Sequence, residues 1–151
     1  MVKKKKSNLE DLINCSMHQR MHDLIVKSVK RGYEHKISNG IYPYAPKIGY
    51  IVKRECKLVI DPKVRKYIEE IFHMFLSGKT VSEINVKLSH AKSKNKALKH
   101  TIFNEVSIKR VLSDPIYAGM MRIKDRGVLP AIHEPFISKE QYFECQRLLN
   151  K

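Results

Sequence analysis

Apolar residues in the first part of the chain recur in steps of three and four, which places them on one face of an α-helix. The stripe consists of Leu9, Leu12, Ile13, Met17, Met21, Leu24, Ile25, Val29 and Tyr33. We predict a long helix over residues 1–38, of which about thirty residues would measure ~45 Å at ~1.5 Å per residue. A small domain cannot cover such a stripe, so part of it is expected to meet another domain or a second subunit. The alternative is that the helix folds back on the domain that follows.

Between positions 39 and 49 the helical pattern gives way to frequent Gly and Pro residues. Gly40, Pro43, Pro46 and Gly49 interrupt the chain there, which predicts an extended linker over 39–49. The short β-forming runs 50–52 and 58–60 then predict a β-hairpin.

The widest apolar helix face follows Asp61-Pro62, where Asp is a favourable N-cap and Pro a favourable first helical residue. This face is formed by Val64, Tyr67, Ile68, Ile71, Phe72, Phe75 and Leu76. Gly78 predicts the end of the helix, because glycine adopts left-handed geometry at low cost. We expect this segment to be the core helix.

Two shorter helices are expected next. Thr80 and Glu83 have capping-box spacing and begin a helix that ends near Ala91. The basic stretch 92–100 is predicted to be a loop. Asn104 then caps a helix that ends at Asp114-Pro115.

A second hairpin and a last helix complete the pattern. Residues 116–123 and 128–132 predict two strands around the turn 124–127. Ser138 and Gln141 form another capping box, and Phe143, Leu148 and Leu149 are expected on the inner side of the last helix. The expected fold class is α+β and mostly helical: a long N-terminal helix, then a compact helix-turn-helix-like domain over 50–151 with short β-hairpins.

The charge of the chain indicates a polyanionic partner. Lys and Arg number 30 against 15 Asp and Glu, which gives a net charge of +15, and such cations release counterions when they contact phosphates. A membrane surface would require a basic helix with a bulky apolar face, and the chain has no Trp. Since no apolar run is long enough for a membrane span or a signal peptide, no membrane partner is expected. The run Lys3 to Lys6 is either a disordered tail or the exposed beginning of the long helix.

Cysteine and histidine do not indicate a cofactor. The 3 Cys residues are scattered, which fits a reducing cytoplasm. His18 and His22 are four residues apart, but two ligands without a third are weak evidence for a metal. We expect a cytoplasmic protein with no metal and no cofactor.

Within the predicted domain, the excess of basic over acidic residues is largest in the segment 80–112. Between His90 and Arg110 the only acidic residue is Glu105. Two helices followed by a basic hairpin resemble a helix-turn-helix with a wing, in which the second helix enters the major groove. The connection between the helices is longer than usual, so a solvated basic helix on an ordinary α+β domain is the alternative. Expected DNA contacts are Lys92, Lys94, Lys96, Lys99, Asn104, Ser107, Lys109, Arg110, Arg122, Lys124 and Arg126.

The order of these signals resembles the recombinase domain of large serine recombinases, which include phage integrases, over roughly residues 28–151. The motifs that carry the resemblance are Pro46-Lys47-Ile48-Gly49-Tyr50, Ser77-Gly78-Lys79-Thr80, Asp114-Pro115-Ile116-Tyr117-Ala118-Gly119 and Ile132-His133-Glu134-Pro135-Phe136-Ile137-Ser138. Singly they are weak, but in this order and spacing they are specific. The chain departs from the family pattern at Phe103, where the family has Trp, and at Asp114, where it has Asn.

The resemblance implies a place within a longer parent protein. In the family a long helix leaves the catalytic domain, helps to form the dimer and runs across DNA, and residues 8–38 look like its C-terminal part. The implied partners are double-stranded DNA of an attachment site and the catalytic and zinc-binding domains of the parent chain. A second copy, bound through the long helix, is a candidate partner. No catalytic residue can be carried over, so the chain is not expected to be an enzyme on its own.

The resemblance also suggests how DNA is held. The helix 104–113 would read the major groove of one half-site, and the linker 39–47 would follow the backbone or the minor groove. Lys30, Arg31, Asn39 and Lys47 are therefore further candidate contacts.

Three other functions are alternatives to this interpretation of the sequence. A stand-alone winged-helix transcriptional regulator would show the same charge pattern. A nuclease would have to use Asp61, Glu69 or His133, which do not form a cluster in the sequence. An RNA-binding module would need exposed aromatic residues for stacking, and Tyr33, Tyr42 and Tyr44 are the loosely clustered candidates.

Overall fold

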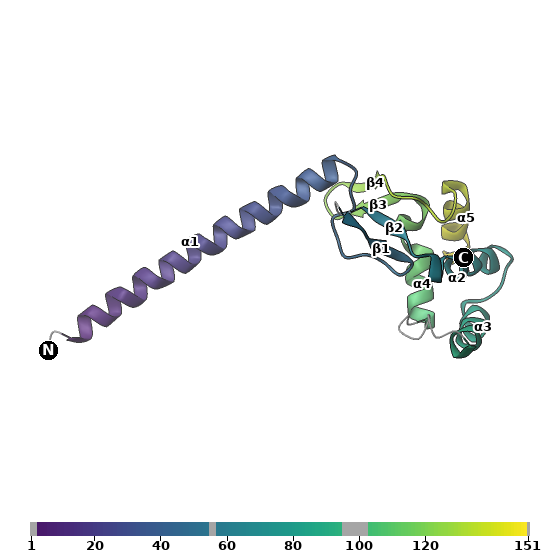
Figure 1. Cartoon of the computed structure of the whole chain (residues 1–151), viewed down its shortest axis with the longest axis horizontal. Coiled ribbons are helices and arrows are strands. Elements are labelled where there is room, and N and C mark those ends of the chain that lie inside the picture. The colour runs from purple at the N-terminus through teal and green to yellow at the C-terminus, as the bar shows by residue number, and fades with distance from the viewer. Residues whose placement is uncertain (1–2, 55–56, 95–102, 151) are drawn as a thin grey trace. The chain divides into compact units, whose positions relative to one another are not determined.

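The computed structural model describes residues 3–54, 57–94 and 103–150 and divides the chain into two compact units, 1–39 and 40–151. The first unit is the helix α1 (Lys3–Ser38; Figure 1). The long helix is confirmed, and because it begins at Lys3, the lysine run belongs to the helix. The apolar stripe from Leu9 to Tyr33 is exposed along its length, with relative exposures from 41% to 64%.

The second unit contains four α-helices, one 3-10 helix and two β-hairpins within the described residues. Its elements are β1 (Tyr50–Val52), β2 (Leu58–Ile60), α2 (Pro62–Leu76), α3 (Val81–Lys94), α4 (Glu105–Ser113), η3 (Pro115–Ala118), β3 (Met120–Ile123), β4 (Gly127–Pro130) and α5 (Lys139–Leu149). Both hairpins are antiparallel; Tyr50 pairs with Ile60 and Met120 with Pro130. The expected α+β, mostly helical fold class is confirmed.

Local capping sets most helix ends where the sequence predicts them. The Asp61 carboxylate accepts a hydrogen bond from the Lys63 N–H at 2.9 Å at the beginning of α2. At the beginning of α3, the Thr80 N–H donates to Glu83 Oε2 at 2.7 Å. α3 extends to Lys94, beyond the end expected near Ala91, so the predicted loop 92–100 is partly helical. The rest of that stretch lies outside the described residues.

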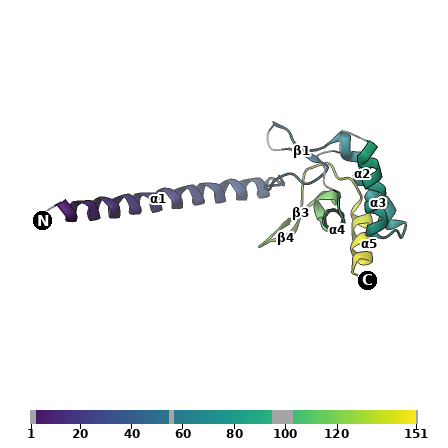
Figure 2. The same ribbon diagram turned by 90° about the horizontal axis from the view of Figure 1, so that it is seen from below.

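The core of the second unit forms where α2 contacts α3, α4 and α5 (Figures 1 and 2). Fully buried side chains come from each of these segments and from η3; they include Ile68, Ile84, Leu88, Ile108, Leu112, Ile116 and Cys145. Each buried aliphatic side chain of this size contributes about 1.5–3 kcal/mol. Because Ile108 and Leu112 bury one face of α4, the other face of that helix is left for polar residues.

The segment 116–123, predicted to be a single strand, is a 3-10 helix in its first half. The Asp114 carboxylate accepts a hydrogen bond from the Ile116 N–H at 3.2 Å, and Pro115 favours the first helical position. Gly119 then ends η3 with a φ of 73°, a left-handed conformation that glycine tolerates. The prediction was therefore wrong before Met120, and β4 is Gly127–Pro130 where 128–132 was expected.

The inner face of the last helix also differs from the prediction. The Ser138–Gln141 capping box is present, but the buried residues of α5 are Tyr142 and Cys145, and Phe143 is 60% exposed. Tyr142 enters the core because its hydroxyl donates to the Ser113 carbonyl at 3.2 Å, which satisfies its polar end. Leu148 and Leu149 are half-buried.

Candidate nucleic-acid interface

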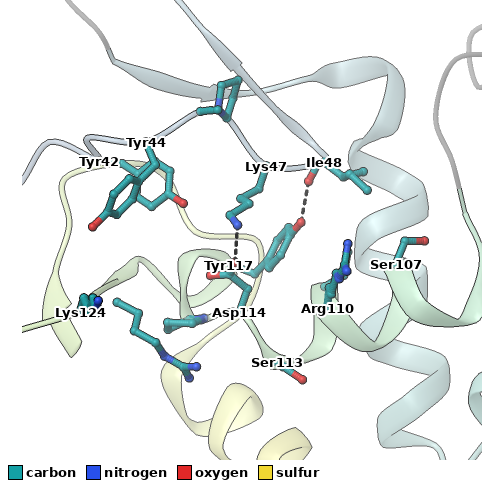
Figure 3. A pocket seen from close by; sticks show the side chains of 15 residues that line it. Tyr42, Tyr44, Lys47, Ile48, Ser107, Arg110, Ser113, Asp114, Tyr117 and Lys124 are labelled. Atoms are coloured by element: carbon teal, nitrogen blue, oxygen red, sulfur yellow. Dashed lines mark hydrogen bonds and ion pairs between the residues drawn. The ribbon is translucent and has the colours of Figure 1, made fainter. Parts of the chain in front are cut away.

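A cleft of about 820 Å³ opens in the second unit between the segment 42–48, α4 and the β3–β4 hairpin (Figure 3). Its lining residues are Tyr42, Tyr44, Ala45, Pro46, Lys47, Ile48, Ser107, Arg110, Val111, Ser113, Asp114, Pro115, Tyr117, Arg122 and Lys124. Four of these side chains are cationic: Lys47, Arg110, Arg122 and Lys124. The cleft therefore combines aromatic and aliphatic surface with basic groups from three parts of the sequence.

Helical spacing brings Ser107 and Arg110 to the cleft. They are three residues apart on α4 and so share a face, whereas Ile108 and Leu112 are fully buried in the core. Arg110 is exposed. The buried side of α4 thus fixes the direction in which the basic side faces.

Strand alternation brings Arg122 and Lys124 to the same cleft. In β3 the neighbours of Arg122, which are Met121 and Ile123, are buried while Arg122 is exposed. Side chains two residues apart in a strand point to the same side, so Lys124, just beyond β3, follows Arg122. Packing of the apolar face of β3 therefore turns both cations outward.

The segment 42–48 forms the opposite wall and is held at both ends. Near its beginning the Ile132 N–H donates to the Gly40 carbonyl at 3.1 Å. At its end the Tyr117 hydroxyl donates to the Ile48 carbonyl at 2.8 Å (Figure 3). The rings of Tyr42 and Tyr44 meet edge to face with centroids 5.4 Å apart. Burial, and secondarily the charge of Asp114, raise the pKa of Tyr42 to about 12, so its hydroxyl is neutral near pH 7.

Asp114 supplies a carboxylate to this basic cleft. One of its oxygens, Oδ2, lies 3.4 Å from Lys47 Nζ, and the other, Oδ1, accepts the Ile116 N–H that begins η3. Lys47 is thus ion-paired, and the same carboxylate joins the wall segment to the end of α4.

Five of the predicted contact residues line the cleft: Lys47, Ser107, Arg110, Arg122 and Lys124. Lys109 on α4 and Arg126 in the β3–β4 turn are exposed but do not line it. Lys92 and Lys94 fall within α3, and Lys96 and Lys99 lie outside the described residues.

The remaining predicted contacts belong to the first unit or to a helix cap. Lys30 and Arg31 are exposed on α1, and the Asn39 side-chain amide donates to the His35 carbonyl at 2.9 Å. Asn104 and Ser107 cap α4 reciprocally: the Ser107 N–H donates to Asn104 Oδ1 at 2.7 Å, and the Asn104 N–H donates to Ser107 Oγ at 2.8 Å. These two side chains therefore hold the beginning of α4.

Several lining residues were not predicted as site residues. Tyr42 and Tyr44 were predicted only as candidate base-stacking residues of an RNA-binding module, and Asp114 only as the end of a helix and as a departure from the family pattern. Two tyrosines within a Gly- and Pro-rich linker were the available signal, because such residues are unusual in a purely flexible connection.

The residues considered for nuclease chemistry have structural partners. Asp61 caps α2, Glu69 pairs with Arg65 at 2.8 Å, and the buried His133 contacts the Ile116 carbonyl through Nε2. Within the described ranges, no three His, Cys, Asp or Glu side chains gather as a metal site would require. None of the helices in the described part of the chain is both long and apolar enough to cross a membrane.

Solved structures that resemble this fold include two at 23% identity. One is a chain from the crystal structure of an LSR–DNA complex, with a TM-score of 0.66 and 23% identity over 82% of this chain and 38% of that chain. The other comes from work on the sequence requirements of the Listeria innocua prophage attP site, with a TM-score of 0.65 and 23% identity over 82% of this chain and 51% of that one. The present chain thus spans about half or less of these proteins. No curated protein sequence matches it.

A family model described as Recombinase matches residues 62–151, which is more than half of the chain. The match includes α2 to α5 and the hairpin that carries Arg122 and Lys124. The chain therefore belongs to the Recombinase family, and the expected resemblance to the recombinase domain of large serine recombinases is confirmed.

Proposed function

We propose that residues 40–151 bind double-stranded DNA at one half of a recombination attachment site, as the non-catalytic domain of a site-specific serine recombinase. The observation that carries the proposal is the cleft, in which Arg110 from α4 and the cations of the β3–β4 hairpin face the same space. A rigid basic surface of this kind suits phosphates, which bind largely by electrostatic attraction and counterion release.

Each wall of the cleft has a different part in the proposed complex. The exposed face of α4 enters the major groove, where Arg110 can donate two hydrogen bonds to a guanine edge. Arg122 and Lys124 contact phosphates beside the groove and set the register of the domain without reading sequence. Tyr44, which is 43% exposed, offers an apolar surface to sugars or to a thymine methyl group.

The similar structures support the choice of partner. One similar chain comes from an LSR–DNA complex, and the other from a study of an attP site. A duplex attachment site is accordingly the partner we propose for this chain, and the proposed setting is the cytoplasm.

The rest of the chain would extend the DNA contact. Residues 1–38 would belong to the inter-domain helix, and residues 39–49 would be the linker that follows the DNA backbone or minor groove. Further contacts are proposed from Lys30, Arg31, Asn39, Lys92, Lys94, Lys96, Lys99, Lys109 and Arg126. The exposed stripe of α1 would meet the catalytic domain of the parent protein or a second copy of the chain, and a zinc-binding domain would follow in the parent.

A salt titration tests the proposal. If about five phosphates are neutralised, log K for a duplex falls against log[salt] with a slope of about −4 to −5. Fluorescence anisotropy of a labelled duplex, measured with the whole chain at several salt concentrations, gives this slope. A slope near zero would contradict the proposed function.

A further inference from the structure

Asp114 is the one anionic side chain among the described residues that line the cleft. Its Oδ2 lies 3.4 Å from Lys47 Nζ (Figure 3), and its Oδ1 is held by the Ile116 N–H. The carboxylate has a relative exposure of 24% and its lysine partner 47%. Asp114 is therefore the fixed member of the pair, and Lys47 is the member that a second anion can reach.

The position of Asp114 matters because it joins three elements at the floor of the cleft. It is the C-cap residue of α4 and the N-cap residue of η3, and it draws Lys47 of the wall segment toward both helices. Its charge also contributes, after burial, to raising the pKa of the buried Tyr117 hydroxyl that holds Ile48. The negative charge of Asp114 thus acts on both Lys47 and the Tyr117 hydroxyl, which hold the wall segment 42–48.

We propose that Asp114 restrains the affinity of the cleft for DNA by withholding the charge of Lys47 from the phosphates. The inference rests on the proposed function. A lysine already paired with a carboxylate neutralises little phosphate charge and so releases few of the counterions condensed on the DNA, and the carboxylate itself repels a nearby phosphate. The cleft then binds any duplex more weakly than its four cations would allow. Base contacts from α4 consequently carry a larger share of the binding free energy.

The decisive variant is Asp114→Asn, which removes the charge and keeps a side-chain oxygen for the Ile116 N–H. Asn and Asp are comparable N-caps, so η3 is expected to persist. Releasing Lys47 adds about one phosphate contact, so the salt slope becomes steeper by about 0.9 and affinity near 0.1 M salt rises about eightfold. The probe is a random-sequence duplex of about two helical turns, because the restraint acts on sequence-independent affinity.

Glu70→Gln is the matched control. Glu70 Oε1 pairs with Lys87 Nζ at 2.5 Å, and the two side chains are 27% and 55% exposed, close to the values of the cleft pair. Neither residue lines the cleft. This variant makes the same change in net charge and breaks a similar ion pair, so the proposal expects the wild-type salt slope.

A double-mutant cycle ties the effect to Lys47. Lys47→Ala should lower the magnitude of the slope by about 0.9 in the Asp114→Asn background and by less than half of that in the wild type. The Lys47→Ala single variant tests the proposal even if Asp114→Asn fails to fold. If this variant alone lowers the magnitude of the salt slope by about 0.9, Lys47 already contacts a phosphate in the wild-type chain.

The outcomes separate the two proposals. The proposed restraint by Asp114 is overturned if Asp114→Asn and Glu70→Gln have equal salt slopes. It is also overturned if Lys47→Ala lowers the magnitude of the slope by the full amount of about 0.9 in the wild-type background. Neither result contradicts DNA binding by the cleft. A slope near zero for the wild-type chain overturns both.

Discussion

The Tyr117 hydroxyl donates a hydrogen bond to the Ile48 carbonyl at 2.8 Å, and this bond fastens one wall of the cleft to η3. Tyr117 is almost fully buried, and its ring packs against those of Phe72 and Phe136 with centroids 5.6 and 5.7 Å away. Burial is the main reason that the pKa of this hydroxyl is raised, so it remains a donor near neutral pH. One end of the cleft wall is thus tied to this aromatic cluster through a buried hydroxyl group.

Tyr117→Phe removes that bond and keeps the ring. We expect the free energy of unfolding to fall by about 1 kcal/mol, the usual net value of one buried hydrogen bond. Urea unfolding followed by circular dichroism measures the change. Unfolding at the wild-type midpoint would show that the bond contributes nothing to stability.

The three cleft cations that are not paired with Asp114 should each account for part of the salt dependence of DNA binding. Arg110→Ala, Arg122→Ala and Lys124→Ala are each expected to reduce the magnitude of the salt slope by about 0.9 if the residue contacts a phosphate. If Arg110 contacts a base instead, its variant relaxes sequence preference at one position and costs about 1–3 kcal/mol there.

Lys66→Ala is the control for these variants, because Lys66 is exposed on α2 and does not line the cleft. It removes the same charge, so a slope reduction as large as that of Lys124→Ala would argue for a diffuse effect of net charge and against a cleft.

Asn104 should matter for stability through its cap on α4. Asn104→Ala removes the acceptor of the Ser107 N–H, a bond of 2.7 Å, and such a loss typically costs about 1 kcal/mol. Asn104→Asp keeps an acceptor and should retain most of the stability. Thermal unfolding of the wild type and both variants tests this role. If Asn104 caps α4, Asn104→Asp should unfold at a higher temperature than Asn104→Ala. If it has no capping role, all three proteins should unfold at the same temperature.

His133 should make stability depend on pH. Its ring lies edge to face with Tyr50 at 5.2 Å, and Nε2 contacts the Ile116 carbonyl. Burial lowers its pKa, and the bond to Ile116 and the charge of Asp114 oppose this only in part. The unfolded chain, with a histidine pKa near 6.5, therefore binds the proton first as pH falls.

The contribution of His133 to the free energy of unfolding should accordingly be complete above about pH 6.5. It should decrease as the pH falls toward the folded-state pKa of His133. Imidazole signals followed by NMR should show His133 titrating below about 6.5. A His133 titration at or above that value would contradict the burial argument.

Sequence patterns predicted the structure correctly where it is determined by residues that are close together in the chain. The caps at Asp61 and Asn104 and the runs that became β1 and β2 depend on residues a few positions apart, and all were predicted. The first half of 116–123 was mistaken for strand because the cap from Asp114 and the left-handed Gly119 outweigh β-propensity there. The inner face of α5 was mistaken because the Ser113 carbonyl, which accepts the hydroxyl of the buried Tyr142, is distant in sequence.

The cleft was only partly predictable for the same reason. Basic residues on α4 and on the hairpin were identifiable from charge and periodicity. Their meeting with Lys47 and the two tyrosines depends on the Tyr117–Ile48 bond and on the Lys47–Asp114 pair, which no local pattern indicates.

A hydroxyl-radical footprint of the whole chain on the DNA that flanks its own gene tests the central claim most directly. Binding to one attachment half-site predicts a protected stretch of about one helical turn or somewhat more. The protection should fade when Arg110, Arg122 and Lys124 are replaced together by alanine. Uniform cleavage along the flanking DNA at protein concentrations that saturate binding would contradict sequence-specific recognition by this domain.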